Sequence, residues 1–154
     1  MENNLIVIEN GQLNIYLLDN QVVWEVGRMS KEYTPDIPMH ATTISRRHGR
    51  FQNMDGIWFY MDENPKNGTI RNQKKLSSGL HGRVKPVMVS PGDVFVFGGG
   101  EDAVVSPATV WAFFRTRYYD APWRAMDSRG CSKFLIVDGD TRTKLANPEP
   151  GSVV

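Results

Sequence analysis

Apolar residues occur in short runs separated by turn residues, and none of these runs carries the period of a helix. Asn10-Gly11, Asp19-Asn20 and Gly27 punctuate the first three runs, and such residues favour tight turns between strands. The pattern therefore predicts β-strands throughout. The strand-like runs are Leu5–Ile8, Leu13–Leu18, Val22–Val26, Arg47–Asn53, Ile57–Met61, Thr69–Arg71, Pro86–Val89, Val94–Phe97, Thr109–Tyr118 and Phe134–Val137.

About ten or eleven short strands with no helices between them predict an all-β fold, a two-sheet β-sandwich with mostly antiparallel strands. Two polar segments, Ser30–Pro38 and Asn72–Lys85, are interpreted as loops. The regular alternation of apolar runs and turn residues ends near Asp120. We therefore expect a sandwich domain over residues 1–118 and a C-terminal extension over 119–154. The run Phe134–Val137 favours partial packing of that extension, and its last residues are expected to fray.

Composition indicates a globular protein, with 40% hydrophobic and 23% charged residues and a net charge of +1. That charge gives no global attraction to nucleic acid or membrane, so an anion would have to be bound locally. Cys131 is the only cysteine, which excludes an intramolecular disulfide and a cysteine-based zinc site and favours a cytoplasmic setting. The N-terminus has no signal-peptide pattern, no run is long enough to span a membrane, and no metal or cofactor is expected.

Two motifs carry groups suited to a phosphate monoester, which presents three acceptor oxygens and a charge near −1.5 to −2 at neutral pH. Arg28 follows Gly27 at the end of a strand and offers a planar, bidentate guanidinium. Ser45 offers a hydroxyl, and Arg46 and Arg47 add two cations beside it. None of these groups could obviously cleave a phosphate, so recognition is favoured over catalysis.

His48 begins a strand whose alternation buries one face. A neutral imidazole that donates to one backbone carbonyl and accepts from one backbone amide would brace the loop that carries Ser45. A Ser45–His48 nucleophile and base is the rival interpretation. It lacks an orienting carboxylate and a nucleophile elbow, so we expect no enzyme.

Asn67-Gly68 is a turn signal, and a carboxamide at such a tip can also bind the backbone of an extended peptide. Lys66 could add charge beside it, and the hydroxyl of Thr69 could fix the turn.

These motifs occur in the order Gly27-Arg28, Ser45–His48, Asn67–Thr69 with Asn72, and Ser90–Gly98. Over residues 3 to 118 this order resembles the forkhead-associated (FHA) domain. The resemblance implies an eleven-stranded β-sandwich that binds phosphothreonine peptides through loops at one end. Lys66 departs from the small hydroxyl residue usual before the Asn-Gly pair. The resemblance implies phosphopeptide contacts by Arg28, Ser45, Arg46, Lys66 and Asn67, site shaping by Gly27, His48, Gly68 and Thr69, and a specificity role for Thr43.

The resemblance implies a threonine-phosphorylated protein partner, such as a Ser/Thr kinase or its substrate, and a role in signalling. Two alternatives remain open: an FHA-fold interaction domain without phosphate dependence, and a nucleic-acid-binding β domain using Arg46, Arg47, Arg50 and exposed aromatics such as Trp58. The net charge and nearby acidic residues weigh against nucleic acid. Thr141 and Thr143 lie in a polar stretch that could be phosphorylated and fold back onto the same site.

Overall fold

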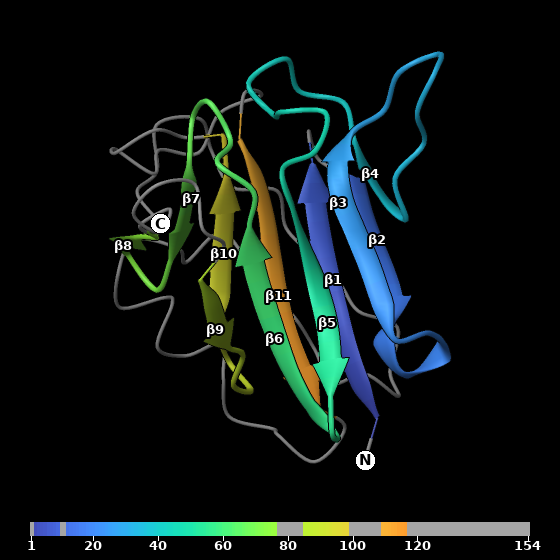
Figure 1. Cartoon of the computed structure of the whole chain (residues 1–154), viewed down its shortest axis with the longest axis vertical. Coiled ribbons are helices and arrows are strands. Elements are labelled where there is room, and N and C mark those ends of the chain that lie inside the picture. The colour runs from blue at the N-terminus through green and yellow to red at the C-terminus, as the bar shows by residue number, and fades with distance from the viewer. Residues whose placement is uncertain (1, 10–11, 77–84, 99–108, 117–154) are drawn as a thin grey trace.

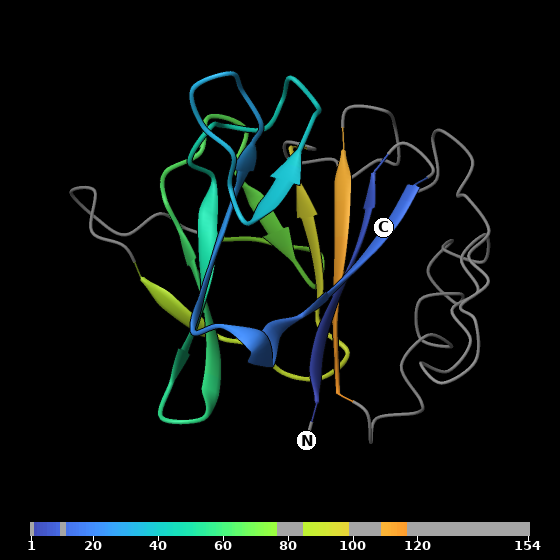
Figure 2. The same cartoon turned by 90° about the vertical axis from the view of Figure 1, so that its right-hand side faces the viewer.

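The computed structural model describes residues 2–9, 12–76, 85–98 and 109–116, which form eleven strands in two facing sheets (Figures 1 and 2). The six-stranded sheet has the order β2-β1-β11-β10-β7-β8 and the five-stranded sheet the order β4-β3-β5-β6-β9. The predicted all-β, two-sheet fold is confirmed. The strands are β1 (Asn3–Glu9), β2 (Gln12–Leu17), β3 (Val23–Arg28), β4 (Ile37–Met39), β5 (Gly49–Met54), β6 (Ile57–Asp62), β7 (Thr69–Arg71), β8 (Lys74–Lys75), β9 (Pro86–Met88), β10 (Val94–Phe97) and β11 (Val110–Thr116).

Two short strands were missed because both lie in segments interpreted as loops. β4 overlaps the polar segment Ser30–Pro38 and pairs with β3 in the only parallel pairing of the described strands. It is an edge strand, where a proline such as Pro38 is tolerated, and its neighbours Ile37 and Met39 are fully buried. β8 consists of two exposed lysines and is the edge strand beside β7 in the six-stranded sheet. Its sequence has no apolar alternation that would predict a strand.

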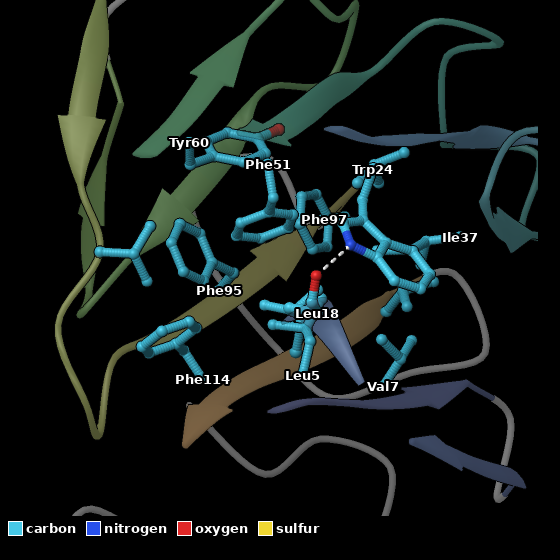
Figure 3. Packing of buried hydrophobic residues seen from close by; sticks show 14 of the residues in the cluster. Leu5, Val7, Leu18, Trp24, Ile37, Phe51, Tyr60, Phe95, Phe97 and Phe114 are labelled. Carbon is cyan, nitrogen blue, oxygen red and sulfur yellow. Dashed lines mark hydrogen bonds between the residues drawn. The ribbon is translucent and has the colours of Figure 1, made fainter. Parts of the chain in front are cut away.

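The core fills the space between the sheets with side chains from alternate strand positions (Figure 3). Four rings form its centre: Phe51 and Tyr60 have centroids 4.9 Å apart, and Phe95 lies 5.3 Å from Phe51. Phe97 completes the group at 5.9 Å from Tyr60. The indole Nε1 of Trp24 donates to the carbonyl of Leu18 at 2.9 Å, which satisfies its one polar atom.

Trp58 belongs to this core, contrary to the expectation that it is exposed. It is only 3% exposed, because alternation along β6 turns Trp58 and Tyr60 to the same inner face. A stacking surface for nucleic-acid bases therefore cannot be built on this residue.

Several expectations fall outside the described residues. These are the extension 119–154, the run Phe134–Val137, the last residues of Thr109–Tyr118, and Thr141 and Thr143. In the described part of the chain, no helix is long and apolar enough to cross a membrane. No group of three or more metal-ligating side chains occurs among the same residues.

Candidate functional site

The candidate site lies at one end of the sandwich, where the β3–β4, β4–β5 and β6–β7 connections come together (top of Figure 1). The end of β3 is tied to the β4–β5 connection by the amide of Arg28, which donates to the carbonyl of Ser45 at 3.1 Å. A Cβ on Gly27 would lie 1.9 Å from the carbonyl oxygen of Arg46, so only glycine fits there. Ile44, 1% exposed, anchors the same connection in the core.

The guanidinium of Arg28 is held in place by one hydrogen bond with the β4–β5 connection. Its Nη1 donates to the carbonyl of Thr42 at 3.1 Å. A guanidinium has five N–H donors, so most of them remain available for an anion.

The hydroxyl of Ser45 is oriented but keeps its proton available. Its Oγ accepts the backbone N–H of Lys66 at 3.0 Å, which links the β4–β5 and β6–β7 connections. Because that bond uses a lone pair, the hydroxyl hydrogen can still donate to an oxyanion.

His48 is completely buried just before β5 and bridges three backbone or side-chain groups. Its Nδ1 accepts the amide of Ser45 at 3.2 Å, so Nε2 carries the proton. Nε2 faces the carbonyl of Gly68 at 3.0 Å and Oγ1 of Thr69 at 2.9 Å. Burial lowers its pKa to about 4, so the ring is neutral at physiological pH. The two backbone bonds expected from the sequence are both present.

The hydroxyl of Ser45 makes no bond with either ring nitrogen of His48 in the structure. Nδ1 is occupied by the backbone amide of Ser45, and Nε2 points to Gly68 and Thr69. The arrangement that would activate a serine nucleophile is therefore not formed.

Asn67 is fixed at the tip of the β6–β7 connection. Its Nδ2 donates to the carbonyl of Thr43 at 2.8 Å, and Gly68 beside it has a φ of 72°. This bond orients the carboxamide and leaves Oδ1 as an acceptor for an extended peptide. Thr43, which the resemblance implies in specificity, is half-buried on the facing connection.

A buried carboxyl behind the site was missed by the sequence reasoning. Asp62 Oδ1 accepts the hydroxyl of Thr69 at 2.6 Å and that of Tyr60 at 2.9 Å, so a continuous chain of hydrogen bonds runs from Ser45 through His48 to Asp62. Burial raises the pKa of the Asp62 carboxyl. The sequence places Asp62 on the same face as Trp58 and Tyr60 by alternation along β6, but it does not reveal that Thr69 is the partner of the carboxyl.

Tyr33 was also missed. With Arg46 and Arg47 it lines a pocket of about 420 Å³ beside the β4–β5 connection. The guanidinium of Arg47 lies over the Tyr33 ring, 5.0 Å from its centroid, in a cation–π contact. No strand pattern marks Tyr33, because it lies in an irregular segment.

The site thus has two layers. We call its exposed or half-exposed outer layer the donor rim, which consists of Arg28, Ser45, Arg46, Lys66 and Asn67. We call its inner layer the buried brace, which consists of His48, Tyr60, Asp62 and Thr69. The structure brings all the sequence-predicted site residues to this end of the sandwich. Gly27 lies against the carbonyl of Arg46, and the carbonyl of Gly68 is bonded to the ring of His48.

Comparison with protein families gives a match to the FHA domain over residues 24–98, a range that contains both layers of the site. No curated protein matches the chain.

Solved structures share the fold. Full-length yeast Pml1p aligns with a TM-score of 0.58 and 21% identity, over 74% of this chain and 81% of Pml1p. An FHA domain from work on phosphothreonine-dependent FHA interactions aligns with a TM-score of 0.53 and 17% identity, over 75% and 97%. The FHA domain of FhaA, solved with the intracellular domain of Rv3910, aligns with a TM-score of 0.51 and 18% identity, over 73% and 99%.

Proposed function

This chain carries an FHA domain, and from that premise we propose that it binds a threonine-phosphorylated protein through the donor rim. FHA domains are protein-interaction modules, and one of the similar structures comes from work on phosphothreonine-dependent binding. The single observation that carries the proposal is that two donors, the guanidinium of Arg28 and the hydroxyl of Ser45, are each held by a hydrogen bond on segments that are hydrogen-bonded to each other.

Each residue of the rim has a chemical role in the proposal. Arg28 and Ser45 bind the phosphate oxygens, and Arg46 and Lys66 add positive charge around them. Asn67 binds the peptide backbone through Oδ1, while Thr43 contacts a residue a few positions after the phosphothreonine. Gly27, His48, Gly68 and Thr69 shape the loops without touching the ligand.

The magnitudes fit a moderate affinity. One charge-assisted hydrogen bond contributes about 1.5–3 kcal/mol, so Arg28 and Ser45 together supply roughly half of the ~8 kcal/mol of a micromolar complex. Contacts with the peptide backbone supply the rest. The partner is a cytoplasmic signalling protein, such as a Ser/Thr kinase or its substrate.

A nucleic-acid role has less support. Trp58 is buried and Arg50 is paired with Glu63 at 2.5 Å, so two of the four side chains invoked for it are engaged inside the domain.

The test is an oriented phosphothreonine peptide library, followed by calorimetry with the selected peptide and its phosphoserine and unphosphorylated counterparts. We expect binding only with phosphothreonine, or at least a tenfold preference for it. Equal affinity for the unphosphorylated peptide would indicate the phosphate-independent alternative and overturn the proposal.

The pH dependence of binding gives a second check. The second pKa of the phosphate is near 6, so affinity should fall as the pH drops through about 6 and the dianion becomes a monoanion. The pKa of His48 is about 4, so this residue does not titrate in that range. A flat affinity between pH 5.5 and 8, measured with one phosphothreonine peptide, would contradict the phosphate as anchor.

A further inference from the structure

The outer face of the six-stranded sheet is unexpectedly apolar. Side chains on this face alternate with the core residues of the same strands, and the register aligns them in rows across the sheet. One row crosses β2, β1, β11 and β10, and a second crosses β1, β11, β10 and β7. The rows are Ile15, Ile6, Phe113 and Val94, and Ile8, Trp111, Val96 and Ile70.

These outer side chains are nearly as buried as the core. Phe113 is 0% exposed, Trp111 2% and Val96 1%, and Ile6 and Ile8 are each 3% exposed. The five-stranded sheet cannot account for this burial, because it packs against the opposite face, where Val110, Ala112 and Phe114 lie in the core (Figures 2 and 3).

The burial is graded across the face. At the β2 edge, Ile15 is 46% exposed and Leu17 51%, whereas Ile6 and Phe113 in the same row as Ile15 are almost fully buried. A cover that lies over β1, β11 and β10 and ends before β2 accounts for this gradient.

We propose that residues 117–154 of the same chain form this cover, with the apolar run Phe134–Val137 as its anchor. The chain leaves β11 at Thr116, and β11 is a central strand of this very face. Phe134–Val137 is the longest apolar run beyond that point. The chain that follows Thr116 can therefore bring Phe134–Val137 onto this face without crossing to the other side of the sandwich.

The charged residues of the outer face and of residues 117–154 are complementary. Arg115 continues the outer face at the end of β11 and is only 5% exposed, and a buried guanidinium requires anionic or carbonyl acceptors. The extension supplies carboxylates on both sides of its apolar run, at Asp120, Asp127, Asp138 and Asp140.

If residues 117–154 cover this face, the folded domain includes them and is larger than the segment that matches the FHA family. A chain trimmed at the end of β11 would expose a contiguous apolar face that includes Trp111 and Phe113, and large exposed apolar patches promote association. The face is then an internal interface of this chain, and external partners bind at the loop end of the sandwich.

Methyl NMR of the full chain tests the proposal, because its isoleucines sample every relevant location. Ile6, Ile8 and Ile70 lie on the outer face, Ile37 and Ile44 in the core, and Ile136 in the anchor run. In the wild-type protein we expect nuclear Overhauser contacts from the Ile136 methyl to those of Ile6 or Ile8. Their absence, or contacts only to Ile57 on the other sheet, would overturn the proposal.

A matched pair of variants adds a second readout. Phe134→Gln with Leu135→Gln removes apolar side chains from the anchor, and Thr141→Gln with Thr143→Gln places the same two residues at polar positions. We expect the first pair to shift the methyl signals of Ile6, Ile8 and Ile70 while those of Ile37 and Ile44 stay, and the second pair to leave all of them unchanged. Outer-face signals that ignore the first pair, or that shift with protein concentration in the wild type and so indicate a second copy as cover, would contradict the proposal.

Discussion

The donor rim and the buried brace lie next to each other and are built in opposite ways. In the rim, Arg28 and Asn67 each use one donor on a neighbouring carbonyl and keep other polar atoms available. In the brace, His48 and Thr69 form hydrogen bonds with every polar side-chain atom they have. From this difference we infer that the brace determines loop geometry and stability, and we propose that the rim determines the affinity for a phosphopeptide.

Substitution of Gly27 should have the largest effect, because Gly27 lies directly against the backbone of Ser45 and Arg46. In Gly27→Ala the new Cβ would clash with the carbonyl of Arg46, so we expect a loss of about 3 kcal/mol of stability together with loss of peptide binding. Denaturant unfolding and calorimetry measure the two effects. Gly56→Ala is the control, since its φ of 84° causes strain while no atom lies near the new Cβ. It should cost about 1 kcal/mol and spare binding.

A substitution in the brace should reduce stability first. His48→Ala removes a buried ring and the hydrogen bonds that it forms with the amide of Ser45 and the carbonyl of Gly68, so we expect unfolding to become easier by about 2–4 kcal/mol. His40→Ala, at an exposed histidine, should change stability by less than about 0.5 kcal/mol. If His48→Ala were as stable as the wild type, the brace would have no structural role.

The pH dependence of stability should also report on the brace. The pKa of His48 is about 4 in the folded protein and near 6.5 in the unfolded chain, so the unfolded state binds the proton more readily. Stability is therefore complete above about pH 6.5 and should fall by about 2 kcal/mol at pH 5. The raised pKa of Asp62 acts in the opposite direction at lower pH. Comparison of unfolding curves with those of His48→Asn isolates the histidine, and equal pH slopes in both proteins would refute this assignment.

The smallest effect is expected for a single rim hydroxyl. Ser45→Ala should weaken peptide binding by about 1.5–2 kcal/mol and cost less in stability, since it removes one phosphate donor and the acceptor of the Lys66 amide. Ser30→Ala is a matched control, because the Oγ of Ser30 also accepts a backbone amide, that of Tyr33, at 3.1 Å. Calorimetry should show unchanged affinity for this control. An equal loss in both variants would assign the effect to loop order.

Much of the fold could be predicted because runs such as Val94–Phe97 combine β-prone residues with clear turn signals. β4 could not be predicted, since its central proline, Pro38, and its short length conceal the buried residues Ile37 and Met39. Its burial also depends on a parallel pairing with β3. The burial of Trp58 was not predicted, because a hairpin strand with apolar residues on both faces has no clear polar alternation to show which face is exposed.

The site was predictable where residue chemistry and sequence position agree. His48 follows Ser45 by three positions, a distance at which an imidazole reaches back to the amide of Ser45. Asp62 and Tyr33 were not predicted, because their roles depend on which residues the sheets bring together across the chain. Their partners, Thr69 and Arg47, lie 7 and 14 positions away.

The most direct test of the rim is a thermodynamic cycle between Arg28 and the phosphate. The wild type and Arg28→Ala are each titrated with the phosphothreonine peptide and with its unphosphorylated form. Arg50→Ala is the control, because it removes the same charge at a residue that is paired with Glu63. We expect a coupling energy of about 2–3 kcal/mol between Arg28 and the phosphate, and near zero for Arg50. If Arg28→Ala weakened the binding of both peptides equally, or of neither, Arg28 would not bind the phosphate and the proposed role of the donor rim would be wrong.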